Sequence, residues 1–294
     1  MSAIFKRAKT RRGKKFLEGR APKITENDKT ALFLKGGKTN ENLTKFLTDV
    51  YQMKKPLAEK LKQKNPIHLF EDCTFVEKMS RKYDAALFML ISNSRKRPNA
   101  VTFGRTFDHQ MLDMVELQLV DYKATDHFKE ELFPVGTKPV ILLQGLSFES
   151  DDVFKKIGNM FVDFFRGPVV QKVRLQGLEM VIALTATEDR IFMRTYRSVL
   201  KKSDSSTPRV ELVEVGPSAD FAINREKFAS ENLMKKAMKQ PKQLKQKMRK
   251  NTSENVFGTK LGRIHLGQQN VQGIQTRKVK ALRKPRVQKQ NDAE

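Results

Sequence analysis

Cysteine is nearly absent from the 294-residue sequence, which contains only Cys73. A single cysteine excludes an internal disulfide, and the four scattered histidines have no CxxC motif beside them, so nothing indicates a structural zinc site. The longest apolar run, residues 85–91, is seven residues long, whereas a membrane-spanning helix needs roughly 20. Residues 1–15 carry charge but no apolar stretch, so we expect no secretory signal there. The composition is not typical of a secreted, disulfide-rich or membrane-spanning protein.

Positive charge is abundant and unevenly placed. The sequence has 58 Lys and Arg against 33 Asp and Glu, a formal net charge of +25. Residues 1–23 hold nine basic residues and one acidic residue, and residues 225–294 hold 19 and five. The stretch between them, 24–224, holds 30 basic and 27 acidic residues. This distribution indicates a nearly neutral globular body with two basic arms, which self-repulsion keeps extended until a polyanion neutralises them.

Nucleic acid is the polyanion that these arms favour, because each neutralised phosphate releases a counterion. A solubilising or nuclear-import tail is the alternative interpretation, and residues 6–15 (KRAKTRRGKK) fit an import patch. A membrane surface is a poorer match, since it requires a basic amphipathic helix with bulky apolar anchors. The arms are instead rich in Lys and Gln with few aromatic residues.

The body repeats one pattern twice, which predicts an α+β fold of two similar α/β halves. In about 29–123 a short apolar strand ends at glycine, an amphipathic helix follows, and strands with one polar face complete the pattern. The same order recurs in about 138–224, without any repeat at the level of residues. Strands with one polar face favour antiparallel pairing over a doubly wound parallel sheet.

The same patterns predict the boundaries of the domain and of its arms. We expect a disordered basic arm at 1–28, a folded domain at 29–235 and a basic, largely disordered tail at 236–294.

Local signals within the domain predict individual elements. Asn40 is expected to cap one helix, and Ser150 is expected to cap another that continues to residue 165. Residues 56–65 are interpreted as a helical piece because Leu57 and Leu61 are four residues apart, and residues 173–175 as a short strand.

Motifs for catalysis are missing. The sequence Gly37-Lys38-Thr39 follows a strand, but a phosphate-binding P-loop also needs glycine at the position of Leu32. No GxGxxG, HExxH or GxSxG motif is present. Adjacent acidic pairs such as Glu130 and Glu131 point in different directions and make poor catalytic dyads. We therefore expect no enzyme activity, no cofactor and no metal.

Clustered cations are the stronger signal. Three of them, Arg95 to Arg97, lie in a turn beside a buried strand, and Arg105 is expected on the polar face of the next strand. Arg forks and Lys point charges in such places form phosphate-contacting surfaces, although a solvated basic turn without function has the same composition. The predicted RNA-binding residues are Lys35, Lys38, Arg95, Lys96, Arg97, Arg105, Arg225, Lys235 and Lys236.

Three segments resemble Brix-domain proteins: residues 93–99 (NSRKRPN), 103–108 (FGRTFD) and 112–116 (LDMVE). The strand ends at residues 35–37 (KGG) and 214–217 (EVGP) fit the same family. The resemblance extends over about 28–235. It implies two pseudo-symmetric halves related to anticodon-binding domains. Many Brix proteins have Arg after the last Gly-Pro, as a presumed RNA contact, whereas this chain has Ser218 there, so that role is not transferred.

The resemblance also implies a function. It implies a non-catalytic assembly factor of the nucleolus and nucleus that acts on the large (60S) ribosomal subunit and binds its rRNA. Family members of this type pair with the regulator of ribosome synthesis protein. The pair helps to load 5S rRNA, with its two ribosomal proteins, onto the precursor particle.

Two other classes remain open. An RNA-processing enzyme would need clustered acids or a cofactor loop, and the sequence contains neither. A generic DNA-binding or RNA-binding regulator would need a recognition helix, and the Lys/Gln-rich stretch 235–249 is interrupted by Pro241.

Overall fold

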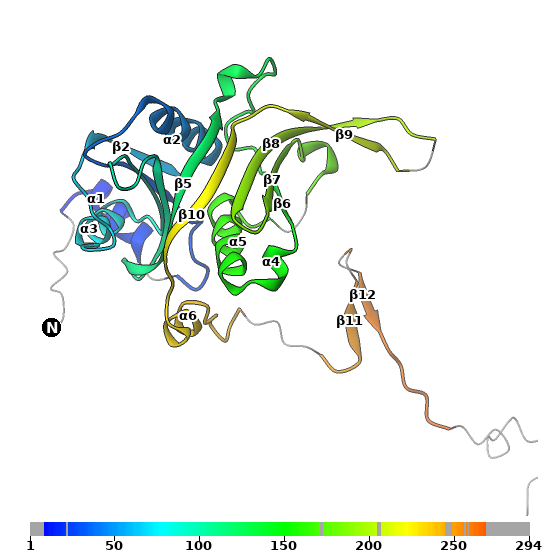
Figure 1. Ribbon diagram of the computed structural model, residues 1–294. Coiled ribbons are helices and arrows are strands. Elements are labelled where there is room, and N and C mark those ends of the chain that lie inside the picture. Colours follow the sequence, from blue (N-terminus) through cyan, green and yellow to red (C-terminus); the bar gives the residue numbers. More distant parts are fainter. Residues whose placement is uncertain are drawn as a thin grey trace, which may run out of the picture. The chain divides into compact units, whose positions relative to one another are not determined.

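The computed structural model describes residues 9–268, except 22, 171–172, 205–206, 245–248, 256 and 258. It consists of two units, Met1–Pro241 and Lys242–Glu294. In the described part of the first unit a ten-stranded sheet, with helices beside it, forms the body (Figure 1). No helix in the described ranges is long and apolar enough to cross a membrane.

The N-terminal half begins with a strand–helix–strand unit. β1 runs parallel to both β2 and β3, and β3, β4 and β5 then continue the sheet in antiparallel pairs. The elements are β1 (Ala31–Lys35), α2 (Glu41–Lys54), β2 (Ala58–Lys64), α3 (Thr74–Tyr83), β3 (Leu87–Ser92), β4 (Ala100–Phe107) and β5 (Gln110–Lys123). Asn40 caps α2 as expected, since its side-chain oxygen accepts a hydrogen bond from the Leu43 amide at 2.9 Å.

The C-terminal half repeats this arrangement. β6 runs parallel to β7, and β7, β8 and β10 pair antiparallel, while β9 pairs with the outer part of β8 in a ribbon that projects beyond the sheet (Figure 1). The elements are β6 (Val140–Gln144), α4 (Ser147–Ser150), α5 (Asp152–Phe165), β7 (Met180–Ala186), β8 (Arg190–Lys201), β9 (Arg209–Glu214) and β10 (Ser218–Lys227). Short 3₁₀ turns lie at Thr125–His127 and Leu175–Gly177. The expected α+β fold of two similar halves is confirmed.

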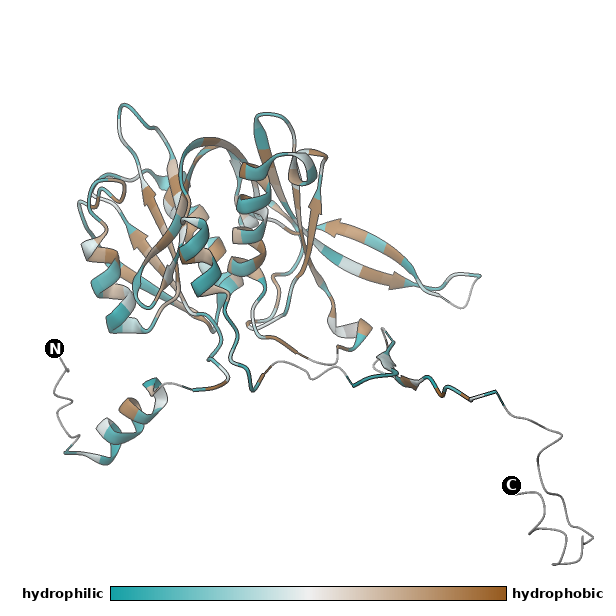
Figure 2. Ribbon diagram, turned by 90° about the horizontal axis from the view of Figure 1, so that it is seen from below, coloured by the Kyte–Doolittle hydropathy of each residue, from teal (hydrophilic) through white to brown (hydrophobic). Residues whose placement is uncertain are grey.

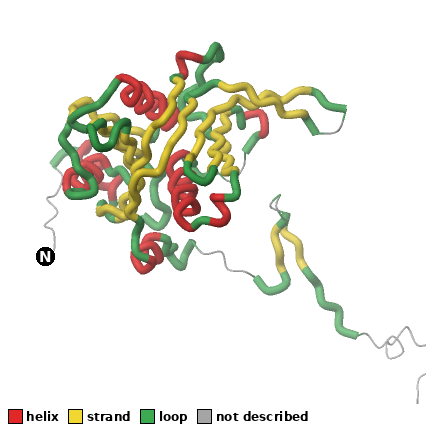
Figure 3. Tube along the Cα trace, in the orientation of Figure 1, coloured by secondary structure: helices red, strands yellow, loops and turns green. Residues whose placement is uncertain are grey.

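The two halves share one sheet, because β5 and β10 pair antiparallel at its centre. The strand order is β2-β1-β3-β4-β5-β10-β8-β7-β6. In Figure 3 the strands form one continuous layer through the body. The sequence analysis did not identify β10, the strand that joins the halves.

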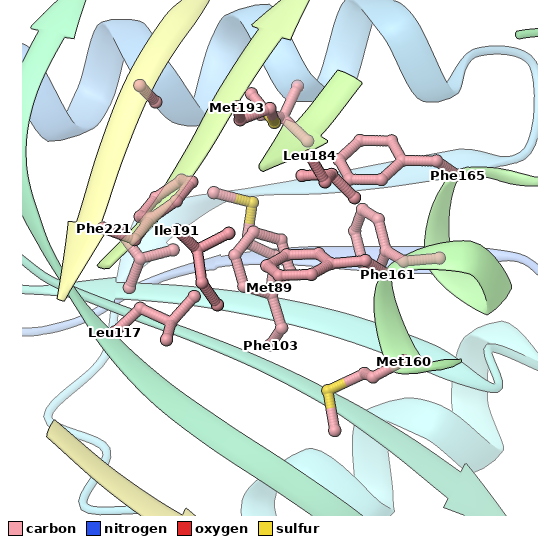
Figure 4. Close-up of a cluster of buried hydrophobic side chains, with 14 of the residues drawn as sticks. Met89, Phe103, Leu117, Met160, Phe161, Phe165, Leu184, Ile191, Met193 and Phe221 are labelled. Carbon is pink, nitrogen blue, oxygen red and sulfur yellow. The ribbon is translucent and has the colours of Figure 1, made fainter. Parts of the chain in front are cut away.

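One hydrophobic core runs through both halves on a single face of the sheet. α2 and α5 cover this face, and Phe46 of α2 and Phe161 of α5 both lie beside Phe221 of β10, with ring centroids 5.6 Å and 6.5 Å away. Figure 4 shows the same cluster, where Met89 and Phe103 of the first half lie among Leu184 and Ile191 of the second. Burial of this shared core is the main force that holds the halves together.

The opposite face of the sheet is covered unequally. α3 packs a second cluster there in the first half, with Val76 of α3 against Leu34 and Phe88 of the sheet. Within the described ranges, the second half has no helix at the corresponding position and no strand beside the outer edge of β6. Leu142 and Leu146 are correspondingly exposed, at 36% and 77%.

Several local expectations were wrong. Residues 56–65 contain strand β2 (Ala58–Lys64) rather than a helix, and residues 173–175 contain no strand. Ser150 ends the short helix α4, whereas the Asp151 side chain caps α5 by accepting a hydrogen bond from the Val153 amide at 2.9 Å. A carboxylate at this position also interacts favourably with the helix dipole.

The expectation that the whole N-terminal arm is disordered was wrong, because residues 11–20 form a helix whose N-terminus Thr10 caps. In the N-terminal arm, helix α1 (Arg11–Arg20) contacts the body where the Arg20 guanidinium donates to the Lys82 carbonyl at 2.6 Å. After β10, α6 (Glu231–Ala237) lies within the first unit. In the second unit, β11 (Thr252–Glu254) and β12 (Lys260–Gly262) form a small hairpin. Residues 1–8 and 269–294 of the predicted arms lie outside the described residues. Polar residues predominate along the described part of the second unit (Figure 2).

Candidate nucleic-acid interface

The basic turn between β3 and β4 is held by hydrogen bonds from its backbone amides to its own side chains. The Arg97 amide donates to Ser94 Oγ at 3.1 Å, and the Asn99 amide donates to Asn93 Oδ1 at 3.3 Å. Asn99 has a positive φ of 49°, which asparagine tolerates better than most residues. These bonds leave Arg95 and Lys96 exposed at the tip.

A cavity of about 350 Å³ opens beside this turn. Its floor is a row of four residues that are neighbours across successive strands: Leu90 of β3, Thr102 of β4, Glu116 of β5 and Arg225 of β10. Three segments form its walls: Gly37 and Lys38 after β1, residues 66–71 before α3, and the turn with Asn93, Ser94 and Arg97. We call this feature the Arg225 cavity.

Arg225 is fixed in a defined position. Its Nε and Nη2 donate to the two carboxylate oxygens of Glu116 at 3.1 Å and 2.6 Å. Its guanidinium carbon lies 3.8 Å from the centre of the Phe70 ring. Bidentate pairing and stacking together restrain a side chain that would otherwise be mobile. The side chain is still 31% exposed, so it is accessible from the cavity.

Three cations, Lys38, Arg97 and Arg225, and two carboxylates, Glu71 and Glu116, line the cavity, which leaves an excess of one positive charge. Arg97 Nε lies 3.6 Å from Glu116 Oε1, so the nearly buried Glu116 faces two guanidinium groups. Lys38 is exposed, and no carboxylate within the described ranges forms an ion pair with it. The same holds for Arg95 and Lys96. These cations keep their charge available for an anionic ligand.

A row of lysines lies along the edge strand β2. Lys60, Lys62 and Lys64 alternate along it and therefore share one side of the strand. Lys64 pairs in register with Lys35 of β1, which is half-buried. Burial lowers the pKa of Lys60, and the positive charges of Lys35 and Lys55 lower it further. Edge lysines discourage edge-to-edge aggregation. Lys60 pairs with Phe33 of the core beneath α2, whereas Leu90 of the cavity floor belongs to the cluster beneath α3, so the lysine row and the Arg225 cavity lie on opposite faces of the sheet.

Lys235 and Lys236 belong to a different element, α6. Both are exposed, and Lys235 Nζ lies 3.5 Å from Glu231 one turn earlier. The residues that the sequence predicted therefore do not share one surface. Lys38, Arg97 and Arg225 meet at the Arg225 cavity, whereas Lys235 and Lys236 lie on α6.

Arg105 requires a correction, because it does not lie on a polar, solvated face. Its side chain is 7% exposed and pairs in bidentate fashion with the buried Asp113. Its Nη1 donates to Asn159 Oδ1 at 2.8 Å and lies 3.4 Å from Asp163 Oδ2, both on α5. Arg105 thus connects β4 to α5 and has a structural role. The alternating pattern of β4 did not reveal that both of its faces are covered.

The Gly216-Pro217-Ser218 segment is buried as well. Gly216 has a φ of +78°, and a Cβ placed there would lie 2.4 Å from the Phe128 ring, so only glycine fits. Ser218 is 6% exposed. This position therefore offers no surface for a contact with RNA in this chain.

The described residues do not bring together the side chains that metal binding or nucleophilic catalysis would need. No cluster of three or more His, Cys, Asp or Glu residues suited to a metal occurs within the described ranges. Burial raises the pKa of the Cys73 thiol, and its Sγ donates to the Leu69 carbonyl at 3.0 Å. A thiol with a raised pKa is a poor nucleophile.

Sequence reasoning missed Phe70, Glu116 and the β2 lysines. Phe70 was not distinguishable from a core residue, and Glu116 gained its role only through the pairing of β5 with β10. The lysines did carry a signal, because Lys60, Lys62 and Lys64 alternate with period two.

Comparisons with known proteins match this chain to one family. Residues 36–225 match the family model described as Brix domain. The chain is 52% identical over 277 residues to a protein named Ribosome production factor 2 homolog from Caenorhabditis elegans, covering 94% of this chain and 93% of that one. A protein of the same name from Drosophila melanogaster is 45% identical, covering 98% and 90%. A crystal structure of a probable ribosomal biogenesis protein from Aeropyrum pernix K1 matches with a TM-score of 0.44 and 9% identity, covering 69% and 99%.

Proposed function

The chain belongs to the Brix-domain family, and from this premise we propose that it is a non-catalytic assembly factor of the large ribosomal subunit. It binds rRNA in the nucleolus and helps to recruit 5S rRNA, with its two ribosomal proteins, to the precursor particle. The folded domain at 29–235 holds the partners, and the basic arms add affinity through phosphates. The names of the relatives support the role in ribosome production.

The observation that carries the RNA-binding part is the convergence of cations from distant segments. Lys38, Arg97 and Arg225 come from three loops or strands and surround one cavity, and Arg95 and Lys96 extend beside it without carboxylate partners in the described ranges. If the basic turn were only a solvated loop, nothing would require Lys38 after β1 and Arg225 of β10 to lie beside it. Phosphate groups match such a surface, because both guanidinium and ammonium groups donate charged hydrogen bonds to them.

The test is a salt series that compares 5S rRNA with a matched duplex DNA. We expect a preference for 5S rRNA that persists at moderate salt. Replacing Arg95, Lys96 and Arg97 by Ala should lower RNA affinity about tenfold or more and reduce the slope of log K against log salt by about 2–3, because up to three phosphate contacts are lost.

The matched control removes three exposed cations from the same half. Lys78, Arg81 and Lys82 lie on α3, whose end leads into the start of β3, whereas the basic turn follows the end of β3. Replacing these three by Ala removes the same charge and should leave the slope nearly unchanged. Equal, steeply salt-dependent binding to RNA and DNA, or equal effects of the two triple variants, would contradict a specific RNA surface.

A second observation supports the pairing with the regulator of ribosome synthesis protein. The outer edge of β6 has no strand beside it in the described ranges, and Leu142, Leu143 and Leu146 are exposed along it and just beyond it, at 36%, 41% and 77%. An exposed apolar edge strand is a site where another chain can add its own strand. We assign the protein partner to this edge of the second half, at the opposite end of the sheet from β2.

A further inference from the structure

We propose that the Arg225 cavity holds one unstacked nucleotide of the bound RNA, with its base inside the cavity and its phosphate at the rim. This inference depends on the RNA-binding role proposed above and goes beyond it. A basic surface explains attraction to phosphates in general, whereas a cavity of defined shape selects a nucleotide that has left its helix.

The size of the cavity suits a single nucleotide. Its volume of about 350 Å³ lies at the lower end of the range of roughly 300–1,000 Å³ typical of small-molecule pockets. Its lining combines apolar side chains, Ile67, Leu69 and Leu90, with the polar groups of Asn93, Ser94 and Thr102. This combination suits a flat heterocycle, which has apolar faces and a polar edge.

The floor and wall supply a platform for stacking. The Arg225 guanidinium lies against the Phe70 ring at 3.8 Å and is locked in its plane by two hydrogen bonds to Glu116. Unpaired RNA bases commonly stack on aromatic rings or on guanidinium planes. Because Glu116 and Phe70 already hold Arg225, little side-chain entropy is lost when a base binds.

The rim supplies the charge for the phosphate that follows the base. Lys38 and Arg97 both line the cavity and come from different loops. Glu116 engages both Arg225 and Arg97, and Glu71 is the second carboxylate of the lining, so the three cations exceed the carboxylates by one. A phosphate there would replace water around Lys38 without breaking an ion pair of that lysine within the described ranges.

Paired RNA cannot use these features. In an A-form helix the bases are stacked on one another and their edges lie in grooves, so a protein contacts mainly phosphates and 2′-hydroxyls. Contacts to phosphates and 2′-hydroxyls run along the outside of the RNA helix and place no base inside a protein cavity. The geometry therefore points to a bulged, looped or terminal nucleotide.

The experiment compares four RNA hairpins, each with one bulged nucleotide of a different base, with the same hairpin fully paired. The full-length protein with Phe70→Leu loses the aromatic ring and keeps an apolar side chain. We expect it to bind at least one bulged hairpin about tenfold more weakly than the unaltered protein does, given the usual contribution of one stacked base. Its affinity for the paired hairpin should remain within twofold.

The control is Phe75→Leu, since Phe75 is a half-buried phenylalanine that packs against the same cluster as Phe70 but does not line the cavity. It should bind all hairpins as the unaltered protein does. A 4-thiouridine at the bulge provides a second readout and should crosslink to the segment that contains His68 and Phe70.

The outcomes separate this inference from the proposed function. If the unaltered protein binds bulged and paired hairpins equally, and Phe70→Leu changes neither, the cavity holds no nucleotide, although RNA binding through charge stands. The same holds if the crosslink maps only to the basic arms. If the unaltered protein shows no preference for RNA over duplex DNA, the proposed function itself fails.

Discussion

At the scale of single residues, some cations of this protein are buried against acidic side chains, and others are exposed without an acidic partner in the described ranges. Arg105 is buried against Asp113 and α5, whereas Arg95 is exposed and has no carboxylate partner in the described ranges. Both were predicted to bind RNA, because the sequence gives the charge of a side chain and not the acids that fold against it. Burying a charge without a partner is so costly that a buried arginine indicates an ion pair.

Lys54 is the exception among the buried cations. Its side chain is 6% exposed, and its Nζ donates to the Phe164 carbonyl at 2.5 Å. Burial lowers its pKa to about 8, against the attraction of Asp163. An ordinary lysine in the unfolded chain keeps its proton up to a pKa near 10.4. Between these values the unfolded state binds more protons, so this residue makes the protein more stable as pH rises from about 8 to 10.

We therefore expect a pH-dependent difference between the unaltered protein and Lys54→Met. At pH 7 the variant avoids the cost of burying a charge and should be at least as stable. As pH rises from 7 to 10, the advantage of the variant should fall by up to roughly 3 kcal/mol, the free energy that a shift of a little over two pKa units represents. Urea unfolding at several pH values measures this difference, and a constant difference would contradict the assignment.

At the scale of elements, long periodic segments were predicted well and short mixed ones were not. α2 and α5 were identified because their apolar residues recur at helical spacing and face the shared core. β2 was taken for a helix because Leu57 and Leu61 fit that period, although its lysines alternate as in a strand. β10 follows Gly216-Pro217 and mixes polar with apolar residues, so no period distinguished it.

The Arg225 cavity could not have been predicted from local patterns. Its floor exists only because Arg225 of β10 pairs in register with Glu116 of β5. These residues are 109 positions apart in the sequence. The basic turn was visible in the sequence, whereas Phe70 and Glu116 gained their roles from the tertiary fold.

The exposed edge of β6 leads to a prediction about the protein partner. Replacing Leu142 and Leu146 by Lys places two charges where we expect apolar contact with the regulator of ribosome synthesis protein. Both side chains are already exposed, so the fold should persist, and affinity for the purified partner should fall tenfold or more.

The matched control for this edge is Leu17→Lys on α1, where the side chain is 41% exposed in the other half of the chain. It should bind the partner as the unaltered protein does. Isothermal titration calorimetry measures all three affinities. If the double variant binds as tightly as the control, the partner does not dock at β6.

At the scale of the whole molecule, the two halves resemble separate domains in sequence but share one core. Phe46 of the first half and Phe161 of the second both lie beside Phe221 of β10, which is fully buried. If either half separated from the other, it would lose its packing against the shared core around Phe221 and expose apolar side chains to water. We therefore expect the body to unfold in one cooperative transition, since separate transitions would leave a large apolar surface in water.

The chain has no tryptophan, so single tryptophans can report on each half separately. Tyr51→Trp places a probe on α2 of the first half, and Tyr196→Trp places one on β8 of the second. Urea unfolding should give the same midpoint for both probes, and Phe221→Ala should lower the stability reported by each by roughly 3–5 kcal/mol. Circular dichroism of each variant checks that the probe itself leaves the transition unchanged. Two separate midpoints, or a loss of stability confined to one half, would mean that the halves fold independently and that the continuous sheet only holds them side by side.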